Sequence, residues 1–111
     1  MIDKPVVTIE DREFTLTTSR DKKKLLNRQL GGLIAAVNKL AAVDLDAIAQ
    51  IISIGADLGA KDREFVADAV YDVEDLASIV TPVREYLGQL MSLRKGDEGG
   101  EGNGKKASTS K

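Results

Sequence analysis

The feature that most constrains the fold of this 111-residue chain is an apolar stretch with helical periodicity at residues 30–55. Its apolar side chains recur at spacings of three and four, first at Leu30, Leu33, Val37 and Leu40, then at Leu45, Ile48, Ile52 and the small Gly55. Each set lines one stripe of a helix. Asp44 precedes the second set and can accept hydrogen bonds from the free amides of that helix. The stretch therefore predicts a helical hairpin against which the rest of the chain packs.

Two short runs of β-forming residues, 6–9 and 14–17, precede this hairpin and are separated by polar residues 10–13. The spacing predicts a β-hairpin in which Val7 and Ile9 share one face of the first strand, and Phe14 and Leu16 share one face of the second. An isolated pair of strands is marginally stable in water, so this apolar face should lie on the helices. The alternative is a frayed N-terminal arm.

Further helices are predicted on both sides of the central stretch. Thr17, Thr18 or Ser19 can cap a helix that runs toward Gly31-Gly32, where a kink or a close backbone approach is expected. Gly59 is placed as a left-handed helix end.

A helix beginning at Asp62 and a last helix from Leu76 to about Leu93 should follow. Pro82 lies inside the last pattern, so a break or kink is expected there. The predicted fold is mainly α, with an N-terminal β-hairpin and a compact bundle of about four helices in a single domain at residues 1–95. Residues 96–111 are rich in glycine and charge and are expected to be a disordered tail.

Composition narrows the possible functions. The chain has no Cys and no His, which removes the usual zinc ligands and the commonest general base. No catalytic, metal or cofactor site is therefore expected, and the chain is not expected to be an enzyme. The net charge of −2 gives no overall attraction to nucleic acid or to an anionic membrane. No apolar run approaches the ~20 residues that span a bilayer, and the acidic N-terminal sequence does not resemble a signal peptide. A cytoplasmic location is expected.

Five of the nine residues from 20 to 28 are basic. This cluster can be a solvated helix face, a contact for an acidic partner, or a nucleic-acid surface. No aromatic residue is interleaved for base stacking, which makes nucleic acid the least favoured of the three. The role of the cluster stays open.

The central hairpin and the residues just before it carry more apolar side chains than the two stripes use: Leu25, Leu26, Ile34, Ile51 and Ile54 lie partly outside them. One explanation is a central hairpin that is covered on both sides. The other is an exposed groove for a partner helix, or a self-association surface. These five residues are the candidate partner-binding site.

Segments 7–17, 31–58, 61–72 and 75–90 together resemble a tail assembly chaperone of long-tailed bacteriophages, in the group related to gene transfer agents. The resemblance lies in VTIEDREFTLT, GGLIAAVNKLAAVDLDAIAQIISIGADL, KDREFVADAVYD and DLASIVTPVREYLGQL, and it covers residues from about 6 to 91. It implies a protein without enzymatic activity that keeps the tape measure protein soluble, helps to recruit tail tube subunits in the host cytoplasm, self-associates, and leaves before the virion is complete.

The family often makes a longer second product by ribosomal frameshifting. Gly104, Lys105 and Lys106 can be encoded by an A-rich slippery heptamer, so this region is the candidate frameshift site, and the longer product could carry the tail tube contact.

Two other function classes stay open. One is a small helical adaptor or antitoxin-like binding protein, and the other is a nucleic-acid binder acting through residues 20–28.

Overall fold

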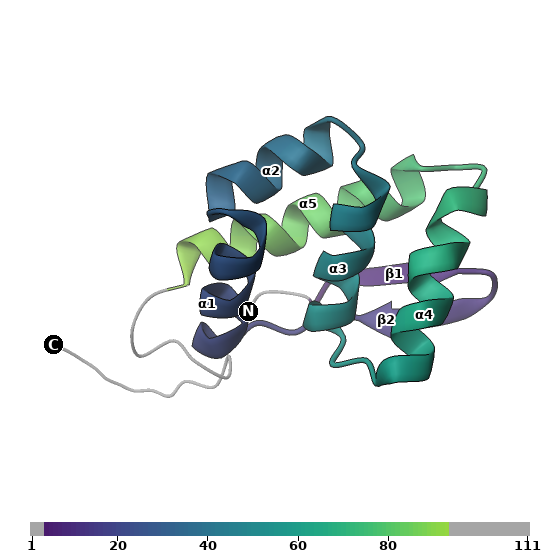
Figure 1. Cartoon of the computed structure of the whole chain (residues 1–111), viewed down its shortest axis with the longest axis horizontal. Coiled ribbons are helices and arrows are strands. Elements are labelled where there is room, and N and C mark those ends of the chain that lie inside the picture. The colour runs from purple at the N-terminus through teal and green to yellow at the C-terminus, as the bar shows by residue number, and fades with distance from the viewer. Residues whose placement is uncertain (1–3, 94–111) are drawn as a thin grey trace, which may run out of the picture.

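Helix α3 (Leu45–Gly55) lies at the centre of the molecule and contacts each of the other four α-helices (Figure 1). The computed structural model describes residues 4–93. The other elements, in chain order, are β1 (Val6–Ile9), β2 (Arg12–Thr15), α1 (Arg20–Leu30), α2 (Leu33–Ala41), α4 (Ala60–Ala69), the 3₁₀ helix η1 (Val70–Asp72) and α5 (Ala77–Ser92). The predicted fold class, mainly α with an N-terminal β-hairpin, is confirmed, although residues 4–93 contain five α-helices and not four. Residues 96–111, predicted to be disordered, lie outside the described residues.

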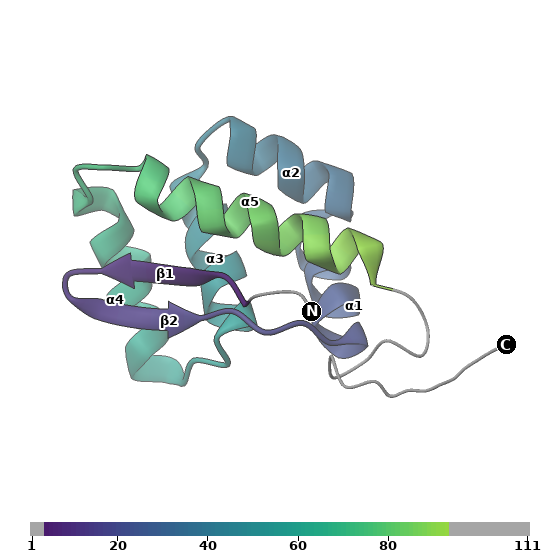
Figure 2. The same cartoon turned by 180° about the vertical axis from the view of Figure 1, so that it is seen from behind.

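The N-terminal strands form an antiparallel hairpin that lies beside α5 and α4 (Figure 2). Val7 pairs with Phe14, and both are buried, while the alternate side chains are exposed. Glu10 and Asp11 both have positive φ, as the tight two-residue turn of a twisted hairpin requires. On the α4 side the Arg12 guanidinium lies over the ring of Phe65, 4.3 Å from its centroid. The hairpin is therefore a part of the core and not a frayed arm.

Gly31 and Gly32 end one helix and begin the next. Gly31 has a φ of 80° and closes α1 with a left-handed cap, and Gly32 has a φ of 117°. A side chain at either position would meet nothing closer than 4.0 Å. The expected close approach of backbones is therefore wrong. The glycines supply positive φ, and the chain is divided into two helices instead of kinking inside one.

The corner between α2 and α3 is capped as predicted but contains an unexpected strained residue. The Asp44 side chain accepts a hydrogen bond from the amide of Ala47 at 3.2 Å, which confirms it as the N-cap of α3. Val43, directly before it, has a φ of 56°. Because Val43 is β-branched, this left-handed conformation brings its Cβ close to the backbone, at a cost of about 1–2 kcal/mol.

We expect Val43→Asn to stabilise the protein by about 1 kcal/mol, because asparagine tolerates left-handed backbone and Val43 is 41% exposed. Thermal unfolding followed by circular dichroism should show a midpoint about 4–8 °C higher. Val6→Asn is the matched control, since Val6 is 42% exposed but lies in an extended strand. A similar rise in both variants would show that surface polarity, and not backbone strain, is responsible.

The region after α3 differs from the prediction. Gly59 has an extended backbone, with a φ of −78° and a ψ of 179°, and serves as the N-cap of α4. The left-handed residue after α3 is Asp57, with a φ of 56°. Gly59 is therefore not the terminator of α3, and α4 begins two residues before Asp62.

Helix α5 continues through Pro82, so the predicted break is wrong. Proline removes one amide donor and costs about 3 kcal/mol inside a helix. Five buried side chains hold the helix together on both sides of it: Ile79, Val83, Tyr86, Leu87 and Leu90. Burying them outweighs the local cost of the proline, since each large apolar side chain contributes about 1.5–3 kcal/mol.

Candidate functional site

A groove of about 440 Å³ lies between α1, the C-terminal end of α3 and the start of α4. Its walls are formed by Ser19, Asp21, Lys22, Leu25, Ser53, Ile54, Asp57, Leu58 and Arg63. Helices α1 and α3 are in contact (Figure 1). We call this surface the α1–α3 groove.

The α1–α3 groove combines apolar walls with charged edges. Leu25, Ile54 and Leu58 are half-buried, so each presents part of its apolar surface to the groove. Ile54 and Leu58 also pack against the buried core. Asp21 on α1 and Arg63 on α4 supply charges of opposite sign at the edges. Such a combination suits an amphipathic peptide, whose apolar side chains fill the groove while its polar side chains meet the rim.

Lys22 fixes one side of the groove through a network of hydrogen bonds. Its Nζ donates to the carbonyl oxygens of Thr17 at 3.1 Å and Gly55 at 2.9 Å, and to the Thr17 hydroxyl. It also forms an ion pair with Asp57 at 3.0 Å. The Tyr86 hydroxyl donates to the same Thr17 carbonyl at 2.7 Å. This network joins the start of α1, the end of α3 and the middle of α5.

Tyr86 stays protonated in this network. Burial of the side chain, followed by the nearby charge of Asp57, raises the pKa of the Tyr86 hydroxyl well above its usual range. A protonated hydroxyl keeps its role as a donor to Thr17. Tyr86 is therefore a structural residue that ties α5 to Thr17, just before α1.

We expect Lys22→Met to lower the free energy of unfolding by about 2 kcal/mol, since it removes several hydrogen bonds from a lysine whose side chain is only 12% exposed. Urea unfolding should detect the loss as a lower midpoint. Lys24→Met is the matched control, because Lys24 is exposed and lies two residues away on the same helix. Equal midpoints for the two variants would contradict a structural role for Lys22.

The structure divides the five predicted partner-binding residues into three groups. Leu25 and Ile54 meet in the α1–α3 groove. Ile34 is 63% exposed on α2 and does not line the groove. Leu26 and Ile51 are both 0% exposed, so placing them on a binding surface is wrong.

The burial of Ile51 has a simple physical cause. Helix α3 is covered on several sides, so residues outside its predicted stripe are buried as well. Leu26 is buried because it lies four residues before Leu30 on the inner face of α1. For these two positions the alternative of a covered central hairpin is correct.

Leu58, Lys22 and Arg63 line the groove but were not predicted as site residues. Leu58 could have been found from its position four residues after Ile54, although the helix ends between them. Lys22 was noted only as a member of the basic cluster at residues 20–28, and Arg63 gave no sequence signal, because an arginine on a helix is usually solvated surface.

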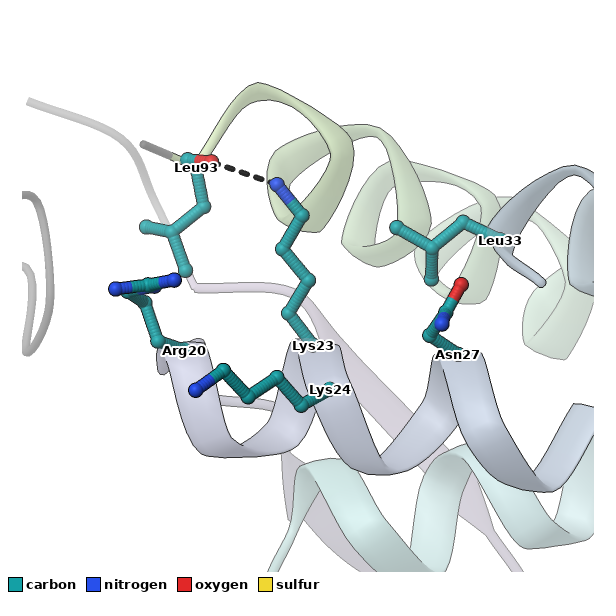
Figure 3. Close-up of a pocket in the computed structure, with 6 residues that line it drawn as sticks. All are labelled: Arg20, Lys23, Lys24, Asn27, Leu33 and Leu93. Atoms are coloured by element: carbon teal, nitrogen blue, oxygen red, sulfur yellow. Dashed lines mark hydrogen bonds between the residues drawn. The ribbon is translucent and has the colours of Figure 1, made fainter. Parts of the chain in front are cut away.

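The basic cluster at residues 20–28 does not form one surface. Lys22 faces the α1–α3 groove, whereas Arg20, Lys23 and Lys24 line a second pocket of about 260 Å³ together with Asn27, Leu33 and Leu93. In Figure 3, Arg20, Lys23, Lys24 and Asn27 extend from α1, and the Lys23 Nζ donates to the Leu93 carbonyl at 2.7 Å. We call this second site the basic pocket.

Among residues 4–93, no group of three or more acidic side chains is placed to hold a metal ion.

Tyr71 is exposed and donates to Asp46 at 2.6 Å. This hydrogen bond is the main cause that raises the pKa of the Tyr71 hydroxyl. In the part of the chain that the structure describes, no helix has both the length and the apolar character needed to cross a membrane. The candidate frameshift site at Gly104, Lys105 and Lys106 lies outside the described residues.

Comparisons with protein-family models, with curated proteins and with solved structures identified no match for this chain.

Proposed function

We propose that this protein is a phage tail assembly chaperone that binds amphipathic helical segments of the tape measure protein in the α1–α3 groove. The observation that carries the proposal is the pairing of half-buried Leu25, Ile54 and Leu58 with a charged rim in one groove. The resemblance of the sequence to tail assembly chaperones supplies the identity of the partner. Binding of this kind needs no catalytic residue, and it would occur in the host cytoplasm.

The size of the groove fits weak and repeated binding. A volume of about 440 Å³ holds a few side chains of a peptide and not a whole helix. A single contact of this size would be released easily when tail tube protein competes. Many copies along one tape measure protein, held also by self-association, would supply avidity without strong single contacts. A frameshift-extended form could add the tail tube contact.

The structure favours protein over nucleic acid as the partner. Lys22 is held by Thr17, Gly55 and Asp57 and lies in a different pocket from Arg20, Lys23 and Lys24, so the cluster does not present one continuous row of cations to a phosphate backbone. Nucleic-acid affinity depends on several such phosphate contacts. The nucleic-acid interpretation therefore has little support in the described surface.

The test is co-expression of the chain with the tape measure protein encoded in the same gene cluster, with the soluble fraction of the tape measure protein as the readout. The wild-type chain should keep it soluble and co-purify with it. Leu25→Glu should abolish both effects, because it places a charge among the apolar groove walls. Leu25 is half-buried and lies outside the buried core, so the variant should stay folded.

Ile34→Glu is the matched control, since it makes the same kind of change at an exposed apolar residue on α2. Circular dichroism spectra of both variants establish that the helices persist. If folded Leu25→Glu protects the tape measure protein as well as wild type does, the groove is not the binding site. If wild type itself gives no protection, the chaperone function is wrong.

A small helical adaptor or antitoxin-like protein is the second candidate, because the same groove would accept a helix from another partner. Co-purification with a short partner protein, and no effect on the tape measure protein, would favour this alternative. Leu25→Glu should then disrupt that complex instead.

A further inference from the structure

One face of α1 forms the polar wall of the basic pocket. Arg20, Lys23, Lys24 and Asn27 follow the spacing of three and four residues that aligns side chains along a helix. Asp21, the acidic residue in the first turn of α1, lines the α1–α3 groove instead. No acidic side chain lines the basic pocket, so within the described chain its three cations share one concave surface.

The position of these cations on α1 adds to the local positive potential. All three lie in the first half of the helix, where the helix dipole is positive and disfavours further cations. Lys23 uses one donor on the Leu93 carbonyl and keeps two. Lys24 is exposed and has no acidic partner within residues 4–93. The pocket therefore has the electrostatic character of a site for carboxylates.

The sequence that follows the pocket supplies such groups. Leu93 is itself part of the pocket wall, and Asp97, Glu98 and Glu101 come four, five and eight residues after it. An extended chain advances about 3.3 Å per residue, so even the nearest carboxylate can reach about 13 Å from Leu93. That distance is enough to span a pocket of about 260 Å³.

We propose that the basic pocket is the docking site for the acidic segment 97–101 of the same chain. Arg94 and Lys95 lie between Leu93 and this segment, and the cations of the pocket repel them. Docking therefore requires that the attraction of the three carboxylates exceed this repulsion. Because the segment is attached at the pocket wall, its effective concentration there is in the millimolar range of short linkers. The docked segment excludes acidic segments of other proteins. This site is separate from the α1–α3 groove, so the docking proposal does not depend on the proposed function.

The test uses the full-length chain with one nitroxide spin label. The chain has no natural Cys, so Gly99→Cys gives a single attachment point inside the acidic segment. Broadening of the amide signals of Arg20, Lys24 and Asn27 is measured by NMR at low salt. The same label is placed in a neutralised chain carrying Asp97→Asn, Glu98→Gln and Glu101→Gln, which keeps the tether but removes the charge.

The acidic chain should broaden the pocket signals about threefold to tenfold more than the neutralised chain, the range expected from a few exposed ion pairs. The excess should vanish at about 0.5 M salt, because exposed charges are then screened. It should also fall when Lys24→Gln is introduced. Equal broadening in the two chains would overturn the proposal, since the tether alone would explain the signal.

A hexaglutamate peptide added in trans provides a second readout. It should bind the neutralised chain about threefold to tenfold more tightly than the acidic chain, because no internal segment competes. Equal affinities would overturn internal docking and would assign the pocket to an acidic segment of another molecule.

Discussion

Replacing Ile51 by aspartate is expected to prevent folding. Ile51 is 0% exposed in the central helix α3, so the new carboxylate would be buried without a partner. Loss of the apolar contacts costs about 1.5–3 kcal/mol, and burial of a charge or its forced protonation costs several more. The total approaches the stability of about 5–15 kcal/mol typical of a whole domain. Circular dichroism at 20 °C should show loss of most helical signal.

Ile34→Asp is the matched control for this prediction. It makes the same chemical change on α2, where the side chain is 63% exposed. Its unfolding midpoint should stay within a few degrees of wild type, since substitutions at exposed positions usually change stability by less than about 0.5 kcal/mol. A folded Ile51→Asp variant would contradict the central position of α3.

The second large effect is expected for Gly55→Val. A Cβ at position 55 would lie 3.1 Å from Leu16 Cδ2 and 3.1 Å from the ring of Tyr86. Both neighbours are fully buried, and Tyr86 is held by its hydrogen bond to Thr17. Because neither can move away freely, valine should overpack this contact and lower the free energy of unfolding by about 3 kcal/mol. Thermal unfolding should show a midpoint at least about 12 °C lower.

Gly88→Ala provides the comparison within another helix. Gly88 lies in α5, is exposed, and has no atom within 4 Å of the position of an added Cβ. Alanine there should raise the free energy of unfolding by about 0.5–1 kcal/mol, because it restricts the unfolded chain and favours the helix. If Gly55→Val were as stable as wild type, close packing of Tyr86 and Leu16 against α3 would be wrong.

Local signals explain why much of the fold was predictable. The alternation of Val7 and Ile9 fixed the buried face of the hairpin, and Asp44 marked the start of α3. The apolar pattern after position 75 predicted a last helix from Leu76 to about Leu93, and α5 spans Ala77–Ser92. In each case the residue type and its neighbours in sequence contain the information, so no tertiary contact is needed.

The errors arise where tertiary contacts decide between local alternatives. Pro82 disfavours a helix locally, but burial of residues on both sides keeps α5 continuous. Gly31 and Gly32 permit a kink, a close contact or the end of one helix and the start of another, and only their φ angles identify the last of these. Gly59 is a plausible helix end until Asp57 is seen to take the left-handed position.

The candidate site was predictable only in part for the same reason. Leu25 and Ile54 were chosen because they lie outside the main stripes, and they line one groove. Ile51 was chosen by the same rule but is covered from another side of α3. Helical periodicity gives the direction of a side chain, whereas the number of neighbouring helices decides whether that direction faces solvent. The Lys22 network depends on three separate elements and could not be anticipated from sequence.

The proposal that the α1–α3 groove receives the partner is tested most directly by hydrogen–deuterium exchange of the free chain and of its complex with the tape measure protein. Binding in the groove should slow exchange at Leu25, Ile54 and Leu58, which line it. Exchange around Ile34 on α2 should not change. Protection on α2 without protection of the groove walls would contradict the account.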